Sequence, residues 1–143
     1  MNVVRKKCHA SRWMFSTSGV WLVGLGFYFI AFRPPLLPED PRFMGASLTE
    51  IQTALPGLES WLKKVFIVMG GFMASTGVLI LFLASIAIPQ RLKGTSWAIA
   101  LSGALSVLLM SAINFSLHSD FKWMLLVPSI FWTVGFVLYL LDR

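Results

Sequence analysis

The chain is organised as four long apolar stretches separated by shorter polar connections. The apolar stretches cover residues 14–32, 65–89, 96–117 and 123–141, and none of them contains Lys, Arg, Asp or Glu. A helix needs about 20 mostly apolar residues to cross about 30 Å of hydrocarbon. The pattern therefore predicts four transmembrane helices. We expect them to form an antiparallel four-helix bundle, all-α in class, with residues 1–143 making a single transmembrane domain.

The only long connection, residues 33–64, begins with a proline-rich segment. Four prolines lie between positions 34 and 41, within the sequence Arg33-Pro34-Pro35-Leu36-Leu37-Pro38-Glu39-Asp40-Pro41-Arg42. Proline fixes its own φ, lacks an amide hydrogen and restricts the preceding residue. This composition predicts an extended, stiff strap. We expect Glu39 and Asp40 to be solvated or paired with Arg33 or Arg42.

A short helix is predicted after the strap. Ser47 and Glu50 have the spacing of a capping box, in which each side chain satisfies a backbone amide of the other residue. Apolar residues then recur at steps of three or four, which places them on one helical face; they are Leu48, Ile51, Leu55, Leu58 and Leu62. We interpret this segment as an interfacial helix on the membrane surface, interrupted near Pro56 and Gly57.

Composition excludes a soluble globular class. The chain is 57% hydrophobic and 13% charged, with a mean hydropathy of +0.76, whereas soluble domains are about 25% charged. The net charge of +6 is assigned to membrane topology. Seven basic residues fall on the side of the termini and the 90–95 turn, and five on the other side. The positive-inside rule then predicts cytoplasmic termini. We expect a multi-pass protein of a bacterial inner membrane, in contact with the lipid bilayer and not with nucleic acid.

Small residues in the second and third spans predict close helix packing. In membranes, small residues four apart allow two backbones to approach each other. The candidate packing positions are Gly70, Gly71, Ala74, Ser75, Gly77, Ser102, Gly103 and Ser106. We expect helix packing, rather than ligand binding, to explain most of them.

One polar stripe offers a candidate ligand site. Ser111, Asn114 and His118 follow the spacing i, i+3 and i+7, so they are predicted to share one helical face. Trp132 and Thr133 lie on the following helix. The plain interpretation is interhelical hydrogen bonding, with His118 at the surface. The functional alternative is the polar end of a small cavity, open to the outer side, for a quinone, lipid or other amphipathic molecule.

Catalytic and metal-binding patterns are lacking in the sequence. The two histidines are predicted on opposite sides of the membrane, and the chain has one cysteine, so no Cys/His metal cluster is expected. No nucleophile elbow, HExxH motif or phosphate-binding loop is present. We therefore predict no catalytic residue, no metal and no cofactor, and an enzyme is the least favoured class.

The architecture resembles the DoxX-like group of small bacterial membrane proteins. The resemblance rests on four spans, a long outer segment after the first, and Met69-Gly70-Gly71-Phe72 followed by Gly77. Residues 33–45 also resemble a strap in uncharacterised bacterial proteins of similar size. Some DoxX-like proteins resemble subunits of quinone-linked oxidoreductases. The resemblance implies a membrane partner and no catalytic residue in this chain.

Two functions follow as hypotheses. The first is a non-catalytic accessory or scaffold subunit of a larger membrane complex, which contacts other membrane subunits or a second copy of itself. One form of this hypothesis makes the complex redox-linked. The alternative is a membrane protein or carrier that binds a small amphipathic ligand such as a quinone or lipid. A scaffold is expected to have a filled bundle centre and an apolar flank. A binding protein is expected to have an enclosed pocket reached from the outer face.

Overall fold

The computed structural model describes the backbone of residues 2–141 and the side chains of residues 10–141. All regular elements within that range are helical. They are α1 (Asn2–Ala31), α2 (Glu39–Met44), α3 (Leu48–Ala54), α4 (Leu58–Ser85), α5 (Ala87–Gln90), α6 (Thr95–Gly103), the π-helical turn η1 (Ala104–Leu108), α7 (Leu109–Ser116) and α8 (Lys122–Leu141). The side chains of Arg5, Lys6, Lys7 and Arg143, which entered the charge comparison, lie outside the described residues.

Four helical segments are long and apolar enough to cross a membrane, as predicted. They are Ala10–Ala31, Leu58–Gln90, Thr95–Ser116 and Lys122–Leu141. The second is 33 residues long, or about 50 Å, because the helix begins at Leu58 and not near Val65. Only 17% of its most apolar window is buried within the chain. Large apolar side chains such as Phe72, Val78 and Leu79 are exposed on this span, as expected for contact with a lipid bilayer.

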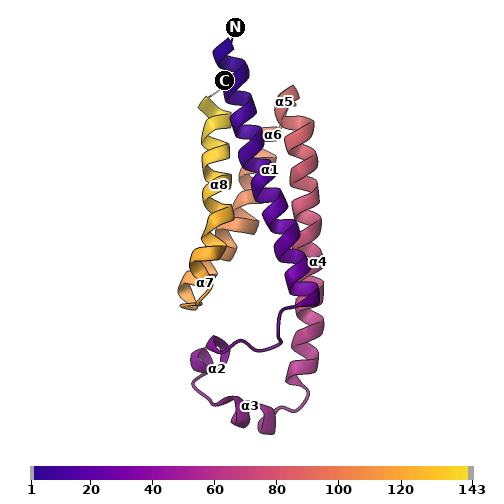
Figure 1. Cartoon of the computed structure of the whole chain (residues 1–143), viewed down its shortest axis with the longest axis vertical. Coiled ribbons are helices and arrows are strands. Elements are labelled where there is room, and N and C mark those ends of the chain that lie inside the picture. Colours follow the sequence, from indigo (N-terminus) through magenta and orange to yellow (C-terminus); the bar gives the residue numbers. More distant parts are fainter. Residues whose placement is uncertain (1, 142–143) are drawn as a thin grey trace.

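Helix α1 occupies the centre of the arrangement. It makes its most extensive contacts with α4 and the next most extensive with α8, whereas the third span contacts chiefly α8. In Figure 1 the start of α1, the end of α8 and α5 lie at one end, and α2 and α3 lie at the other. Toward the α2–α3 end, the paired α1 and α4 diverge from α7 and α8.

Glycines bring α1 and α4 into backbone contact. A Cβ at Gly70 would lie 2.6 Å from the carbonyl oxygen of Gly26, and a Cβ at Gly77 would lie 2.6 Å from the carbonyl oxygen of Gly19. Both distances are far below van der Waals contact, so no larger residue fits without displacing a backbone. The two helices run antiparallel, and each contributes a pair of glycines seven residues apart.

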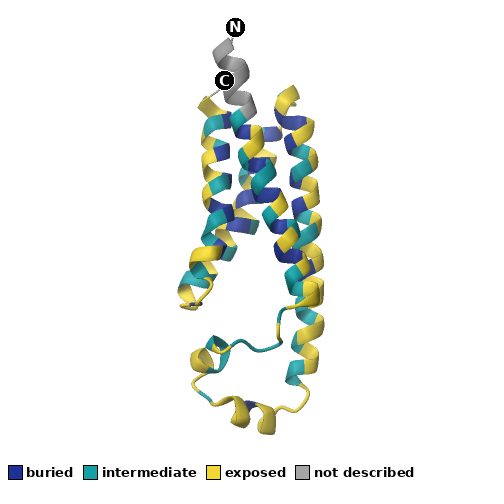
Figure 2. Ribbon diagram, viewed as in Figure 1, coloured by how far each residue is buried: buried dark blue, intermediate teal, exposed yellow. Residues whose placement is uncertain are grey.

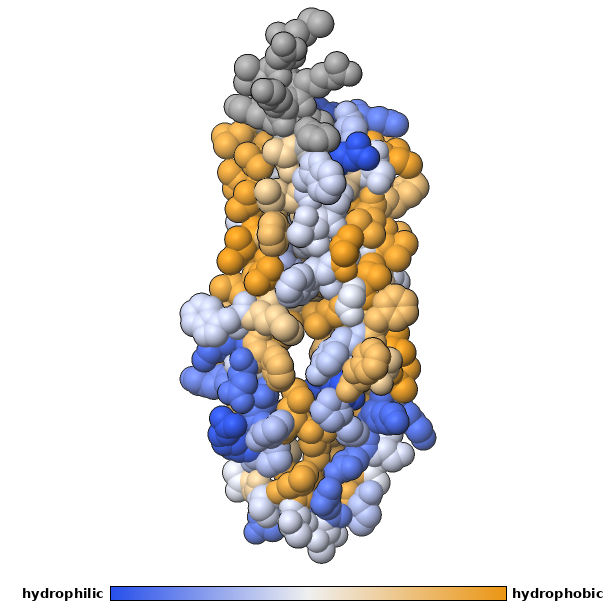
Figure 3. All heavy atoms as spheres, in the orientation of Figure 1, coloured by the Kyte–Doolittle hydropathy of each residue, from blue (hydrophilic) through white to orange (hydrophobic). Residues whose placement is uncertain are grey.

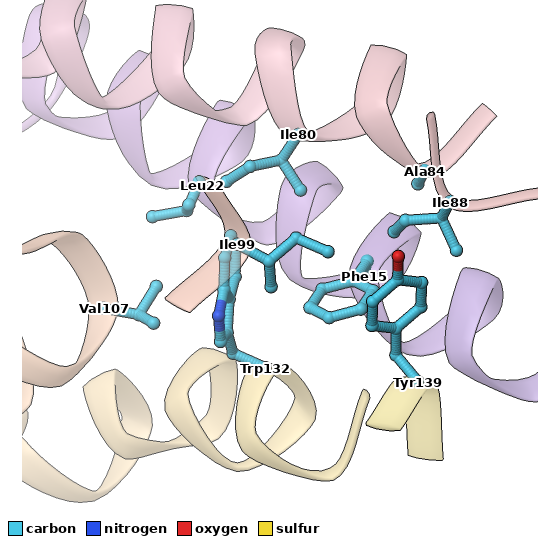
Figure 4. Packing of buried hydrophobic residues seen from close by; sticks show 9 residues of the cluster. All are labelled: Phe15, Leu22, Ile80, Ala84, Ile88, Ile99, Val107, Trp132 and Tyr139. Carbon is cyan, nitrogen blue, oxygen red and sulfur yellow. The ribbon is translucent and has the colours of Figure 1, made fainter. Parts of the chain in front are cut away.

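The half of the molecule nearer the start of α1 and the end of α8 contains a cluster of buried apolar residues. A cluster of buried apolar side chains joins all four spans there, as Figure 4 shows; its members are Phe15, Leu22, Ile80, Ala84, Ile88, Ile99, Val107, Trp132 and Tyr139. The rings of Phe15 and Trp132 meet edge to face at 5.2 Å. In Figure 2 the buried residues are concentrated in this half, and the α2–α3 end is mostly exposed.

Buried serine hydroxyls tie α8 to its neighbours. Ser11 and Ser18 of α1 donate to the carbonyl oxygens of Gly135 and Pro128, at 3.1 and 3.2 Å. From the α8 side, Ser129 donates to the carbonyl of Val107 at 2.7 Å. Such interhelical bonds in membranes average about 0.6 kcal/mol each, so close packing contributes more to cohesion than these hydroxyls do.

The third span is not one regular helix. A single continuous helix was expected over 96–117, but a π-helical turn separates α6 from α7. The turn follows Gly103, whose missing side chain leaves room for the Trp132 indole. A π-helical turn inserts an extra residue into the α-helical register, and here it directly follows Gly103, the residue that faces Trp132 of α8.

The proline-rich strap is shorter than predicted. Residues 33–37 are non-helical, but α2 begins at Glu39 and includes Pro41. The expectation of an extended segment through Arg42 is therefore wrong. Pro41 is the third residue of the helix, where a backbone amide has no intrahelical acceptor. The amide hydrogen that proline lacks would therefore make no helical hydrogen bond at this position. The carboxylates of Glu39 and Asp40 also favour a helix N-terminus at this point.

The capping box before α3 is present as predicted. Ser47 Oγ accepts a hydrogen bond from the Glu50 amide at 3.2 Å, and Glu50 Oε2 accepts from the Ser47 amide at 2.7 Å. The hydroxyl of Ser47 also donates to Glu50 Oε2 at 2.7 Å. Helix α3 ends at Ala54, and α4 starts after Pro56 and Gly57. Ile51 is buried, while Leu48 and Leu55 are exposed.

The Ser47 cap predicts an acid-sensitive helix. Hydrogen bonds from the Ser47 side chain and backbone lower the pKa of Glu50 below its ordinary 4.5. A lowered pKa in the folded state stabilises the fold above the ordinary value, and this contribution is lost as pH falls through the folded-state pKa. We expect helical ¹³Cα shifts of residues 48–54 to decrease as pH falls below 4.5. The variant Glu50→Gln retains a capping group without a charge, so its shifts should stay constant over the same range.

Candidate functional site

A chamber of about 310 Å³ lies where helices α1 and α4 diverge from α7 and α8 (Figure 1). It is lined by the end of α1, the start of α4, the α7–α8 turn and the segment from Pro35 through α2. Figure 3 shows the surface hollowed at this level, between the apolar wall and the more hydrophilic end of the molecule. Its walls are mainly apolar and include Leu25, Phe29, Leu36, Phe43, Leu62, Phe66 and Met124. Six side chains with polar groups also line it, namely Tyr28, Arg33, Glu39, Asp40, Asn114 and Ser119.

Arg33 lies at the chamber wall with its charge already engaged. Its side chain is only 10% exposed. The guanidinium carbon lies 3.5 Å from the centroid of the Phe66 ring and 5.2 Å from that of Phe29. A guanidinium over aromatic faces is stabilised by the ring quadrupole. Nη1 donates to the carbonyl of Pro34 at 3.0 Å.

The charge of Arg33 is also compensated by a carboxylate. Nη2 lies 4.0 Å from Asp40 Oδ2, which is one of the pairings expected from the sequence. Asp40 Oδ2 in turn accepts from the Leu37 amide at 2.7 Å and so fixes the entry into α2. Burial lowers the pKa of Arg33, and the charge of Asp40 opposes that shift. A guanidinium nevertheless stays protonated in proteins, so Arg33 keeps its positive charge.

Among the described residues, only one of the two carboxylate oxygens of Glu39 has a hydrogen-bond partner. Its Oε1 accepts a hydrogen bond from the Ser119 hydroxyl at 2.6 Å, which joins α2 to the α7–α8 turn. Its Oε2 is buried and has no hydrogen-bond partner among the described residues. A second link between α2 and this turn is an exposed ion pair between Arg42 and Asp120 at 3.6 Å. Ser119 itself is buried.

The structure separates the five residues predicted to bind a ligand. Asn114 lines the chamber, and its Nδ2 donates to the Met110 carbonyl of its own helix at 2.9 Å. Ser111 is buried instead between helices, where its hydroxyl lies 2.6 Å from that of Ser129 and donates to the Leu125 carbonyl at 2.9 Å. This position agrees with the interhelical interpretation of Ser111.

His118, Trp132 and Thr133 do not line the chamber. Helix α7 ends at Ser116, and His118 has a positive φ of 52°, so it leaves the face shared by Ser111 and Asn114. Its side chain is exposed. Trp132 is buried in the core. Thr133 donates to the Ser129 carbonyl of its own helix at 2.8 Å.

The predicted packing positions divide into two groups. Gly70, Ala74 and Gly77 face α1, and Gly103 faces Trp132. In contrast, Gly71 has no atom within 4 Å of its Cβ position, and Ser75 is exposed and donates to the Phe72 carbonyl of its own helix. Ser106 likewise donates to the Ser102 carbonyl within the third span. The double glycine therefore has one inward and one outward member.

Several contributing residues were not identified from the sequence. Gly19 and Gly26 complete the α1–α4 contact, and their seven-residue spacing matches that of Gly70 and Gly77. Glu39 was expected to be solvated or ion-paired, but it is half-buried and hydrogen-bonded to Ser119. No local pattern marks that contact, because the two residues are 80 positions apart.

Comparison with protein-family models, curated proteins and solved structures finds no match for this chain. Among the described residues, no group of three His, Cys, Asp or Glu side chains is placed to hold a metal ion. The functional argument therefore rests on the chamber and its own residues.

Proposed function

We propose that this protein binds a small amphipathic molecule in the chamber beside Arg33 and Glu39. The observation that carries this proposal is a mostly apolar chamber with polar groups from separate elements in its wall. Small-molecule sites are typically apolar cavities of about 300–1,000 Å³ with a few placed polar groups. At about 310 Å³, this chamber fits one alkyl or prenyl chain with its head group better than a complete two-chain lipid.

The proposed setting is an antiparallel four-helix bundle in a bacterial inner membrane, with both termini cytoplasmic. The distribution of basic residues, seven against five, supports this orientation. The chamber then opens near the outer interface, where α3 is the proposed interfacial helix. Trp61, Lys63 and Lys64 are exposed at the start of the second span, which fits side chains anchored at that interface.

Photolabelling tests the proposal. The probe is a long-chain alcohol with a diazirine in its alkyl chain, added to the protein in phospholipid nanodiscs. We expect saturable labelling of the peptide that spans residues 33–44, competed by excess unlabelled alcohol. Labelling of lipid-facing positions such as Leu79, which is 63% exposed on α4, should rise in proportion to probe concentration. If labelling at residues 33–44 rises in the same unsaturable way, the chamber is not a binding site.

An accessory subunit of a larger membrane complex is the second proposal. The outward-facing Gly71 and Ser75 support it, because small residues four apart on a free helix face permit another helix to approach. The buried apolar cluster near the termini also supports this proposal. The chamber is nevertheless the more specific feature, because exposed apolar helix faces are equally suited to lipid.

A further inference from the structure

The charged groups of the chamber wall are engaged in contacts within the protein. Glu39 Oε2 is buried, and its Oε1 accepts from the Ser119 hydroxyl. The guanidinium of Arg33 lies over the Phe66 ring and is paired with Asp40. A ligand in the chamber would have to break these contacts to use the same groups. The polar group that holds a head group is therefore to be sought elsewhere in the wall.

Tyr28 is placed in this wall by the last turn of α1. Its backbone carbonyl accepts from the amides of Phe32 and Arg33, each at 2.9 Å. Its ring meets that of Phe29 edge to face, with 6.0 Å between the centroids. The residue is half-buried and lines the chamber. The end of the helix and the ring contact together hold the phenol in position.

The hydroxyl of Tyr28 has no hydrogen-bond partner among the described residues. Within the same part of the chain, the one buried side-chain atom that lacks a partner is Glu39 Oε2. The Tyr28 hydroxyl is therefore accessible, unlike that carboxylate oxygen. A tyrosine hydroxyl in apolar surroundings usually has a hydrogen-bond partner, and a molecule in the chamber can supply one that the protein does not.

Resting on the proposed function, we propose that Tyr28 selects the head group by donating a hydrogen bond from its hydroxyl to an oxygen atom of the ligand. Long-chain alcohols, ethers and methyl esters present such an oxygen, whereas alkanes do not. The alkyl chain lies against the apolar wall beside Leu25 and Met124, which also line the chamber. Tyr28 is thus a specificity-determining residue of this site.

A competition series with three twelve-carbon compounds tests the proposal. The compounds are dodecanol, its methyl ether and dodecane, at equal mole fractions in the nanodisc lipid. Each competes with the diazirine alcohol for saturable labelling of residues 33–44. We expect the alcohol and the ether to compete about two- to tenfold better than the alkane, because a hydrogen bond between neutral groups is typically worth that factor. The ether accepts but cannot donate, so it tests the direction of the bond.

The variant Tyr28→Phe removes the hydroxyl and keeps the ring. We expect the advantage of the alcohol and the ether over the alkane to disappear, and labelling by the diazirine alcohol to weaken by about two- to tenfold. Tyr139→Phe is the matched control, because it removes the other tyrosine hydroxyl of the chain. Tyr139 is buried in the core and does not line the chamber, so this variant should keep the wild-type order. Circular dichroism reports whether each variant is folded.

Three results would overturn the inference. They are equal competition by alkane and alcohol in the wild type, competition by the ether no better than that by the alkane, and survival of the wild-type order in folded Tyr28→Phe. Complete loss of saturable labelling in folded Tyr28→Phe, with labelling retained in Tyr139→Phe, would support it. Absence of saturable labelling of the wild type would instead overturn the proposed function itself, so the two failures are distinguishable.

Discussion

Gly70→Ala is expected to lower the free energy of unfolding by about 1–3 kcal/mol, the usual cost of overpacking a filled site. The new methyl group would lie 2.6 Å from the Gly26 carbonyl oxygen and 2.8 Å from the Ile30 side chain. The first contact is with backbone, which a rotamer change does not relieve. Helices α1 and α4 must separate, and they form the most extensive interface in the molecule.

The adjacent glycine provides a matched control. Gly71→Ala adds the same methyl group where no atom lies within 4 Å. Because alanine favours helix over glycine by up to about 1 kcal/mol, this variant should be neutral or slightly stabilised. Unfolding in mixed detergent micelles, followed by circular dichroism, measures both variants. Equal effects of the two substitutions would contradict the α1–α4 contact described here.

Leu62→Trp is expected to weaken amphiphile binding by about fivefold to 150-fold, because overpacking costs about 1–3 kcal/mol and each 1.4 kcal/mol is tenfold in affinity. Leu62 is half-buried on α4 and lines the chamber. The larger indole on this helix would occupy volume that the ligand needs. Since a ligand that binds only the folded state raises its stability, the measurement is the shift of the thermal midpoint on adding long-chain alcohol.

Leu79→Trp is the control for this experiment. It makes the same substitution on the same helix, at a side chain that is 63% exposed and does not line the chamber. It should keep the wild-type response to the alcohol. The midpoint of each variant without alcohol reports whether it is folded. A folded Leu62→Trp protein that responds like the wild type would place the binding elsewhere.

The elements that the sequence predicts well depend on local rules. Apolar run length alone identifies the four spans. The Ser47–Glu50 cap involves residues three apart, so its pattern is visible in the chain. Helix α2 was missed because proline was treated as a helix breaker at every position, although Pro41 lies in a first turn, where proline is tolerated.

Features built from distant segments were predicted only in part. Gly70 and Gly77 were identified as packing residues, but their partners Gly19 and Gly26 were not. The sequence pattern considered small residues four apart, whereas the glycines of the α1–α4 contact are seven apart on each helix. Asn114 was expected either to hydrogen-bond between helices or to line a cavity; in the structure it lines the chamber and donates to a carbonyl of its own helix. Glu39 and Ser119 acquire their environment from the meeting of α2 with the α7–α8 turn, which neither segment specifies alone.

Native mass spectrometry after gentle extraction from the producing membrane shows most directly whether the chamber retains a small amphipathic molecule. We predict that the wild-type protein carries one small amphiphile, and that folded Leu62→Trp carries none while Leu79→Trp retains it. A bare wild-type chain in stoichiometric complex with a larger membrane protein would contradict the proposal and favour the accessory-subunit role. Equal retention of the small molecule by wild type and Leu62→Trp would also contradict it.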